Sequence, residues 1–271
     1  MLSGALGAEV LGIDLKDSSL KNWNKINNLL LEHKALFFRD QNITSEEQIN
    51  LAKRFGPLER HIYVKGRENY PEILRIIKEP DEKRQWGETW HTDVSYNPKP
   101  TKVIILRSLK IPPVGGDTMF SNMEIAYETL DEKIKNKIKD KKAVHSSLGA
   151  AAFTEAYKAM EGNGNLDEYS NAHPMVRTHP ETGKKILYVN SMYTKKILDT
   201  DAQESEDILN QIFAHQERLD FTCRFKWTEN AVAIWDNRST LHQGLTDFFP
   251  GRGLGHERVM DRIAIEGDHP L

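Results

Sequence analysis

The stretch "FTCRFKWTENAVAIWD", residues 221–236, contains two candidate strands joined by a short polar turn. In the first one, apolar and polar side chains alternate strictly, which is the pattern of a strand with one buried face. The apolar side chains of this face are Phe221, Cys223, Phe225 and Trp227. The second, "AVAIWD" at 231–236, is a further strand candidate. This part of the chain therefore predicts two strands.

Further strand candidates are spread along the whole chain. The turn "PETGK" (180–184) lies between "MVRTH" and "KILYVN", and this arrangement predicts a β-hairpin. The remaining candidates are "ALFFRD" (35–40), "ILRIIK" (73–78), "KVIILRS" (102–108) and "ERVMDRIAIEG" (257–267).

Helices are predicted mainly near the N-terminus and in the middle of the chain. Residues 21–34 place Trp23, Ile26 and Leu30 on one face. Two capping-box patterns, Thr44 with Glu47 and Ser121 with Glu124, each predict the start of a helix, and the first of these helices is expected to end at Gly56. Residues 131–164 are expected to be mostly helical, and a further helix is expected over 203–216. The arrangement favours an α+β fold, in which the strands close antiparallel into a barrel-like double sheet.

The overall composition is that of an ordinary globular protein. The chain has 271 residues, of which 38% are hydrophobic and 28% charged, with a net charge of −3. No basic tract, signal-peptide pattern or apolar stretch of membrane-spanning length is visible, so neither a nucleic-acid nor a membrane partner is expected. Cys223 is the only cysteine, which excludes an internal disulfide. These features predict a cytoplasmic protein.

The segment "WHTDVSY", residues 90–96, is a candidate metal site. In an extended segment, residues two apart point to the same side, so His91 and Asp93 would present an imidazole and a carboxylate together. The best candidate for a third ligand is His242 in "WDNRSTLHQG". Two histidines and one carboxylate suit Fe(II) that must also bind a co-substrate and oxygen. Zinc hydrolases use the same ligand types, so the residues alone leave iron and zinc open.

Two arginines in the last strand candidate could bind anions. Strand periodicity puts Arg258 and Arg262 on one face with Met260 and Ala264. Four residues along a strand correspond to roughly 13 Å, which is suitable for two different anions on either side of a metal. Arginine is the usual choice for bidentate binding of a carboxylate or sulfonate. The alternative interpretation is a pair of exposed arginines on an edge strand.

Several stretches occur together in the order seen in the TauD/TfdA family, and the chain resembles these Fe(II)- and 2-oxoglutarate-dependent dioxygenases over nearly its whole length. The resemblance implies one domain over 1–271, with a double-stranded β-helix (jelly-roll) core and flanking helices. The stretches that carry it are "GAEVLGIDL", "FRDQ", "RFGPLERH", "WHTDVSY", "PPVGGDTMFSNMEIAYETL", "HPMVRTHPETGKKILYVN", "CRFKW", "WDNRSTLH" and "RVMDRIAIEGDHP".

The resemblance also implies roles for particular residues. The three candidate ligands named above would hold the iron. Arg258 and Thr118 of "GGDT" would bind the far carboxylate of 2-oxoglutarate, and Trp235 would pack close to the metal. Arg262 and His61 occupy the positions that contact the substrate in taurine dioxygenase.

Four positions bear on the substrate. Compared with taurine dioxygenase, Gly87 replaces an asparagine and Val64 replaces a tyrosine, although Tyr63 is adjacent. Tyr193 takes the place of an aromatic residue that lines the substrate pocket. These departures weaken the expectation for taurine itself and leave a taurine-like compound as one candidate, whereas a small organic anion is expected because Arg262 and His61 are kept.

The resemblance implies that Fe(II), 2-oxoglutarate and O2 are used to hydroxylate a small sulfonate, sulfate ester or carboxylate, with release of succinate and CO2. Hydroxylation beside the sulfonate, sulfate or ether group would lead to cleavage of the substrate. Two alternatives are a non-catalytic protein that binds metal and 2-oxoglutarate, and a zinc hydrolase. Relatives in the family suggest a homodimer or homotetramer.

Overall fold

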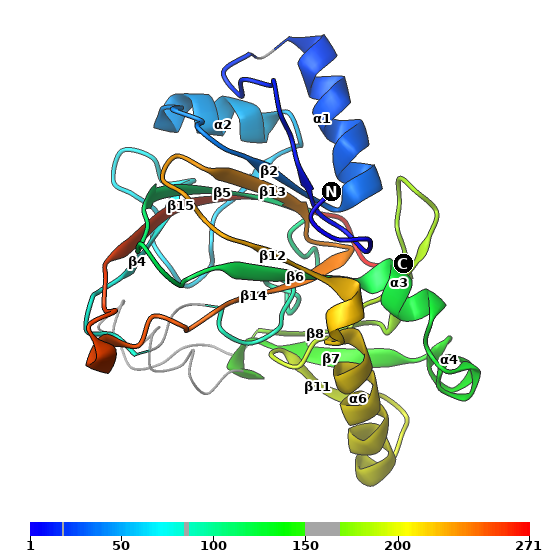
Figure 1. Ribbon diagram of the computed structural model, residues 1–271. Helices are drawn as coiled ribbons and strands as arrows, with labels where there is room; N and C mark the ends of the chain where they lie inside the picture. The colour runs from blue at the N-terminus through cyan, green and yellow to red at the C-terminus, as the bar shows by residue number, and fades with distance from the viewer. Residues whose placement is uncertain (18, 84–86, 150–168) are drawn as a thin grey trace.

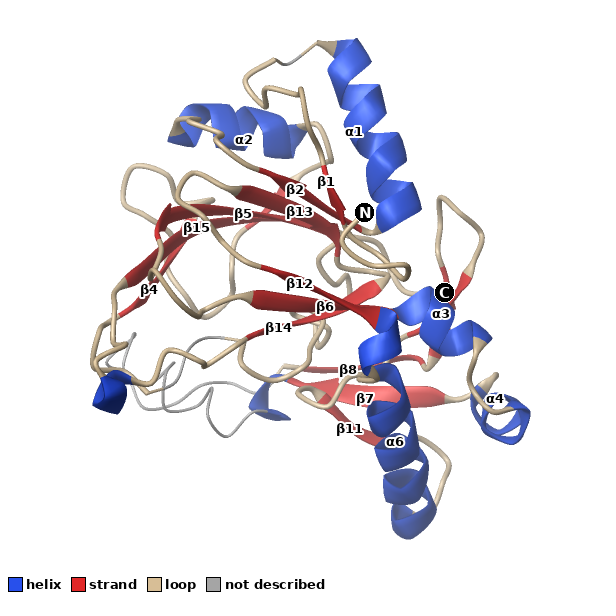
Figure 2. Cartoon of the chain, in the orientation of Figure 1, coloured by secondary structure: helices blue, strands red, loops and turns tan. Residues whose placement is uncertain are grey.

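A computed structural model describes residues 1–17, 19–83, 87–149 and 169–271 of the chain. Its larger sheet has seven strands in the order β1-β2-β13-β5-β15-β3, with β4 also paired to β15. A three-stranded sheet, β12-β6-β14, lies below the larger one in Figure 1. Two smaller sheets, β11-β7-β8 and β10-β9, complete the described part, and Figure 2 shows the mixture of helices and strands. The predicted α+β class is confirmed.

The element bounds are as follows. The strands are β1 Ala8–Glu9, β2 Ala35–Phe38, β3 Leu58–Glu59, β4 Leu74–Lys78, β5 Val103–Lys110, β6 Thr118–Asn122, β7 Lys142–Ser146, β8 Ser170–Pro174, β9 Val176–Thr178, β10 Lys185–Leu187, β11 Thr194–Ile197, β12 Thr222–Phe225, β13 Val232–Asp236, β14 Thr240–Gly244 and β15 Arg258–Ile265. The helices are α1 Leu20–His33, α2 Ser45–Lys53, α3 Met123–Glu128, α4 Glu132–Ile138 and α6 Ala202–Gln216, with short 3₁₀ turns at Ser147–Gly149, Leu219–Phe221 and Pro250–Arg252.

Helices α1 and α2 cover the outer face of the larger sheet (Figure 1). Ile26 and Leu30 of α1 pack with Ile105 of β5, Ile234 of β13 and Ile263 of β15. Burial of these side chains fixes which face of each strand points to the helices. Helix α2 begins with the predicted capping box, in which the Thr44 hydroxyl and the Glu47 carboxylate each accept a backbone N–H.

The other face of the larger sheet packs on the three-stranded sheet. Alternate residues of the same strands, such as Phe37 and Trp235, meet Phe120 of β6 and Phe225 of β12 in this second core. The rings of Phe37 and Phe225 stack with centroids 4.2 Å apart. The expected alternation in β12 is therefore observed, although the strand begins at Thr222 and Phe221 belongs to a 3₁₀ turn.

Two predictions about the middle of the chain are wrong. Ser121 does not cap a helix: it lies in β6, its hydroxyl donates to the Gln216 carbonyl, and Asn122 caps α3 instead. Pairing with β12 and β14 holds Ser121 in the strand. Residues 131–164 are not mostly helical where they are described, because α4 is short and β7 follows it; residues 150–164 lie outside the described part.

No helix in the described part of the chain is long and apolar enough to cross a membrane.

Candidate active site

His91 and His242 are brought together by main-chain pairing. They form an isolated antiparallel bridge, in which the amide of each residue donates to the carbonyl of the other at 3.0 and 2.9 Å. Strand β14 carries His242, and its neighbour β6 holds it in the smaller sheet. The two imidazole rings lie with centroids 4.1 Å apart. The bridge thus places both rings on one wall of a pocket.

Asp93 completes the three-residue cluster. Its Oδ1 lies 3.2 Å from His91 Nε2 and 3.9 Å from His242 Nε2. One ligand atom from each of the three residues lies within 4.8 Å of the others. His91 Nδ1 lies 2.7 Å from the Thr89 carbonyl, which can only accept, so this nitrogen carries the proton and Nε2 keeps a free lone pair. The predicted histidine and carboxylate atoms therefore converge in the form that a divalent metal requires.

The charges of the cluster are set by burial and by Arg262. Burial alone would raise the pKa of Asp93, but the Arg262 guanidinium and the two histidines hold it well below its usual range. Burial and the neighbouring His91 lower the pKa of His242 to about 3. At neutral pH the set therefore contains an ionised carboxylate and, at His242, a neutral imidazole, which are the protonation states that bind metals.

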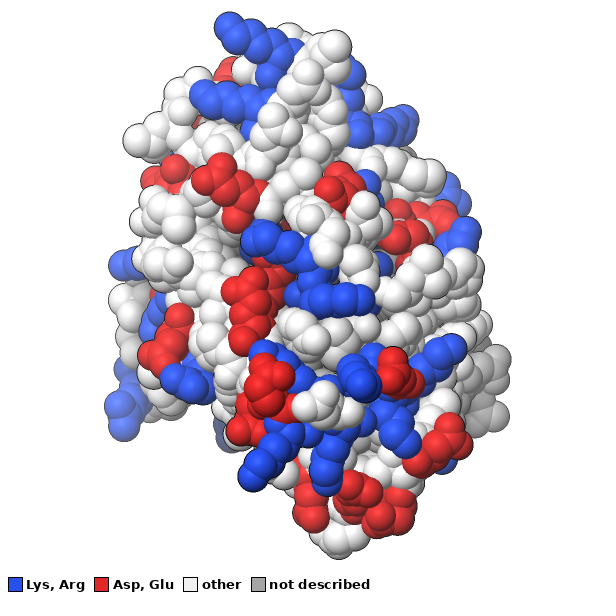
Figure 3. All heavy atoms as spheres, turned by 90° about the vertical axis from the view of Figure 1, so that its right-hand side faces the viewer, with Lys and Arg blue, Asp and Glu red and all other residues white. Residues whose placement is uncertain are grey.

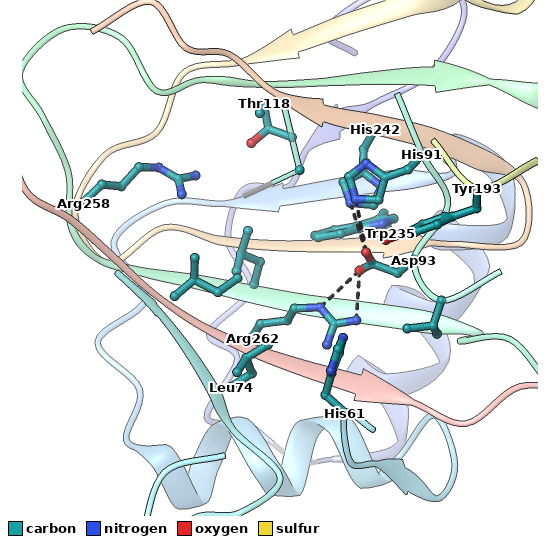
Figure 4. A pocket seen from close by; sticks show the side chains of 15 residues that line it. His61, Leu74, His91, Asp93, Thr118, Tyr193, Trp235, His242, Arg258 and Arg262 are labelled. Atoms are coloured by element: carbon teal, nitrogen blue, oxygen red, sulfur yellow. Dashed lines mark hydrogen bonds and ion pairs between the residues drawn. The ribbon is translucent and has the colours of Figure 1, made fainter. Parts of the chain in front are cut away.

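Arg262 contacts Asp93, one of the three candidate metal ligands. Its Nε and Nη2 lie 3.1 and 2.9 Å from Asp93 Oδ2 (dashed lines in Figure 4). Strand β15 places Arg262 and Arg258 on the pocket side, as the periodicity predicts. The alternative of an exposed edge strand is wrong, because β15 pairs on both sides and each arginine is only 8% exposed.

Arg258 lies at the other end of the pocket beside Thr118 (Figure 4). Its Nε is buried without a hydrogen-bond partner among the described residues, and burial lowers the pKa of this guanidinium to about 10. The Thr118 hydroxyl accepts from Trp227 Nε1 at 2.9 Å, so its own proton is available to a ligand. A Cβ on Gly116 would lie 3.3 Å from Arg258 Cδ, so the glycine leaves space for this side chain. A buried cation without a bonded acceptor at Nε indicates an anion site.

Aromatic and imidazole side chains line the rest of the pocket. Trp235 lies with its ring 4.8 Å from that of His242, close to the metal candidate as predicted. His61 and Tyr193 line the pocket, whereas Tyr63 is absent from its lining and donates its hydroxyl to Ser147 at 2.7 Å. His61 Nδ1 lies 3.2 Å from the amides of Tyr63 and Val64 and accepts from both, which puts the imidazole proton on Nε2.

Gly87 lies against the imidazole ring of His91, one of the three candidate metal ligands. Its φ is +69°, and a Cβ here would lie 2.8 Å from His91 Cε1 and 3.3 Å from His91 Nε2. At this position, where taurine dioxygenase has an asparagine, any side chain in the present conformation would collide with the His91 ring.

Sequence reasoning missed two kinds of residue in the site. Leu74, Ile76 and Leu106 also line the pocket, and strand alternation could have placed Leu106 on this inner face. Asn237 binds the main chain of Asp93 through its side chain, and nothing in the local sequence indicates this contact.

Comparison with known proteins agrees with the geometry. The profile of the "Taurine catabolism dioxygenase TauD, TfdA family" matches residues 1–263, and the chain belongs to this family. It is 35% identical to an alkylsulfatase of Acinetobacter baylyi, over 98% of this chain and 84% of that one. It is 32% identical to the (S)-phenoxypropionate/alpha-ketoglutarate-dioxygenase of Sphingobium herbicidovorans, over 98% and 95%.

A crystal structure of a taurine dioxygenase from Burkholderia xenovorans is similar throughout. It has a TM-score of 0.84 and 33% identity, with 100% of this chain and 89% of that one covered. The chain is accordingly an oxidoreductase of the dioxygenase class that uses 2-oxoglutarate, also called alpha-ketoglutarate.

Proposed function

We propose that His91, Asp93 and His242 hold Fe(II), and that the enzyme uses 2-oxoglutarate and O2 to hydroxylate a small organic anion. The observation that supports this most strongly is that a two-histidine, one-carboxylate cluster and two buried arginines line the same pocket. Three protein ligands on one face of a metal leave positions for a co-substrate and oxygen. Bound iron would supply the oxidising chemistry, and the residues around it would determine what is bound and in which orientation.

Arg258 and Thr118 are proposed to bind the far carboxylate of 2-oxoglutarate. Arg258 Nε has no hydrogen-bond partner among the described residues, and a carboxylate would accept a charge-assisted hydrogen bond from it. The Thr118 hydroxyl, which accepts from Trp227, can donate to the same carboxylate.

Arg262 and His61 are proposed to bind the anionic group of the substrate. The His61 proton lies on Nε2, and burial lowers the pKa of this imidazole to about 3, so it acts as a neutral donor. Burial raises the pKa of Tyr193 well above its usual range, which keeps its hydroxyl protonated beside the metal cluster. These donors favour a sulfonate, sulfate ester or carboxylate.

The remaining lining favours a substrate with an apolar body. Leu74, Ile76 and Leu106 are hydrophobic, and Gly87 contributes no side chain. Asp93 is the only carboxylate in the described lining and is paired with Arg262, so an ammonium group such as that of taurine finds no partner among these residues. An alkyl or aryl sulfate, sulfonate or carboxylate fits this environment better.

We further infer that the two facing sheets form a double-stranded β-helix within one domain over 1–271. The predicted cytoplasmic location and homodimer or homotetramer stay predictions, and so does the expected lack of nucleic-acid and membrane partners. On the face shown in Figure 3, basic and acidic side chains are intermixed, which is compatible with that expectation. The zinc-hydrolase and non-catalytic alternatives are less well supported, because the matched family is one of dioxygenases and both arginines proposed to bind anions line the pocket.

The test is oxygen uptake that depends on 2-oxoglutarate, measured with Fe(II) and ascorbate over pairs of compounds. Each pair combines an alkyl or aryl sulfate, sulfonate or carboxylate with its neutral analogue, and taurine is included. Uptake above the uncoupled background with an anion, but not with its neutral analogue, would support the proposal. Uptake with no anion above background, or equal uptake with both members of each pair, would contradict the substrate class.

A further inference from the structure

We propose that Asn237 is a positioning residue that holds the main chain of Asp93, and thereby sets the place of the carboxylate relative to the two histidines. This inference rests on the proposed metal role of His91, Asp93 and His242. Asn237 lies in the turn between β13 and β14, and its side chain does not line the pocket among the described residues.

The contact between the two residues is reciprocal. The Asp93 amide donates to Asn237 Oδ1 at 3.0 Å, and Asn237 Nδ2 donates to the Asp93 carbonyl at 3.2 Å. The second proton of Nδ2 binds the Thr101 carbonyl at 2.9 Å. Asn237 is 0% exposed, so water does not compete for these bonds. One side chain therefore satisfies both polar main-chain groups of the candidate ligand.

The two residues before Asp93 are held by hydrogen bonds to strand β14, which do not extend to Asp93 itself. His91 is fixed by its bridge to His242, and the Thr92 hydroxyl donates to the Thr240 carbonyl at 2.9 Å. Beyond Asp93 the chain turns away, with Val94 at a φ of +45°. Asp93 therefore lies where the pairing with β14 has ended, and Asn237 extends the connection by one residue.

Asn237 is itself held firmly. Its amide donates to the Lys102 carbonyl at 3.0 Å. The preceding Asp236 accepts from Arg238 at 2.9 and 2.6 Å and lies 2.9 Å from His179 Nε2. Such a buried network of charge-assisted hydrogen bonds fixes the turn from which the Asn237 side chain projects.

The experiment is an isothermal titration calorimetry measurement, in which the metal-free full-length chain is titrated with Mn(II), a redox-stable stand-in for Fe(II). Asn237→Ala removes the hydrogen bonds to Asp93, and the Kd for Mn(II) is expected to rise roughly tenfold or more, because each lost bond contributes to placing the carboxylate. Asn237→Asp keeps an oxygen for the Asp93 amide but loses the amide donor, and the Kd is expected to rise here too.

Asn122→Ala is the matched control. Asn122 is also buried, and its side chain binds main-chain groups of Ala5 and Glu124 at 2.8 and 2.9 Å. This variant is expected to lower the Tm without changing the Kd for Mn(II). An unchanged Kd in a folded Asn237 variant, or an equal rise in Asn122→Ala, would overturn the inference. Wild-type protein that binds no Mn(II) would instead refute the proposed metal site.

If Asn237→Ala does not fold, Asn237→Asp, which keeps the size of the side chain, provides the same comparison. Binding of Mn(II) by this variant with the wild-type Kd would overturn the inference.

Discussion

Arg262 binds the outer oxygen of Asp93, while the inner oxygen of the same carboxylate faces the two histidines. Arg262 Nε and Nη2 lie 3.1 and 2.9 Å from Asp93 Oδ2, and Asp93 Oδ1 lies 3.2 Å from His91 Nε2. The contact leaves Oδ1 for the metal and ties the proposed substrate anchor to a proposed ligand. Changes at Arg262 should therefore affect both substrate and metal.

Arg262→Gln removes the positive charge but keeps an amide donor. We expect the KM of the anionic substrate to rise roughly 10- to 100-fold, because a charge-assisted hydrogen bond in a buried site is lost. The Kd for Mn(II) is expected to rise as well, because Asp93 Oδ2 loses its partner. Steady-state kinetics and calorimetry measure the two effects. Arg60→Gln, at an exposed arginine side chain, is the control, and a KM equal to that of the control would contradict the assignment.

Arg258→Ala should act on the co-substrate instead. The substitution removes the buried guanidinium that lacks a partner at Nε, so we expect the KM for 2-oxoglutarate to rise roughly 10- to 100-fold. The KM of the organic substrate should change much less. Arg262→Gln is expected to raise the KM of the organic substrate more than the KM for 2-oxoglutarate. Equal effects of both variants on both KM values would mean that the two arginines do not bind different anions.

Gly87→Ala tests whether space beside His91 is required. The added Cβ would lie 2.8 Å from His91 Cε1, so we expect the ring to shift and the affinity for Mn(II) to fall roughly tenfold or more. Gly183→Ala is the control, since its φ is +71° and a Cβ there meets nothing within 4 Å. Both variants strain the backbone by about 1 kcal/mol. Equal Mn(II) affinity in the two variants would show that only this strain matters.

The metal-free protein should lose stability in mild acid. Burial lowers the pKa of His145 to about 3 and of His173 to about 4, whereas an unfolded histidine has a pKa near 6.5. In this pH range the unfolded chain binds protons at these histidines and the native state does not. As the pH falls from 6 to 4.5, each such histidine therefore lowers the free energy of unfolding by about 1.4 kcal/mol per pH unit.

His145→Gln should remove one such proton. We expect the slope of unfolding free energy against pH, measured by urea unfolding of the metal-free protein, to fall by about 1.4 kcal/mol per pH unit. His33→Gln serves as a reference, because His33 is less buried, with a side chain 15% exposed. A His145→Gln slope equal to that of the wild type would show that His145 is not neutral in the native state.

Local patterns in the sequence predicted much of the fold. The Thr44 capping box, the β9–β10 hairpin and the alternation that turns Arg258 and Arg262 inward all depend on residues close in sequence, and all are observed. His242, which comes from a distant strand, was also named as the best third partner of His91 and Asp93, and the resemblance to the family implies the same residue; the structure brings the three together.

Other features depend on contacts that short patterns do not contain. Ser121 and Glu124 have the spacing of a capping box, but pairing of β6 with two strands outweighs the local preference. Asn237 reaches Asp93 across the fold, and the contact depends on how the turn after β13 packs. Tyr63 was expected to contact the substrate because it adjoins Val64, the position at which taurine dioxygenase has a tyrosine; this stays a prediction, and the structure shows the Tyr63 hydroxyl donating to Ser147.

The most direct test of the central claim compares wild-type protein with Asp93→Ala in the presence of Fe(II), 2-oxoglutarate and the best anion of the panel. Succinate formed and O2 consumed are measured together, with and without added Zn(II). Our account predicts substrate-dependent formation of succinate with equal consumption of O2 by the wild type, inhibition by Zn(II), and no turnover by Asp93→Ala. Turnover that survives in Asp93→Ala, or wild-type activity that needs Zn(II) and no O2, would contradict it.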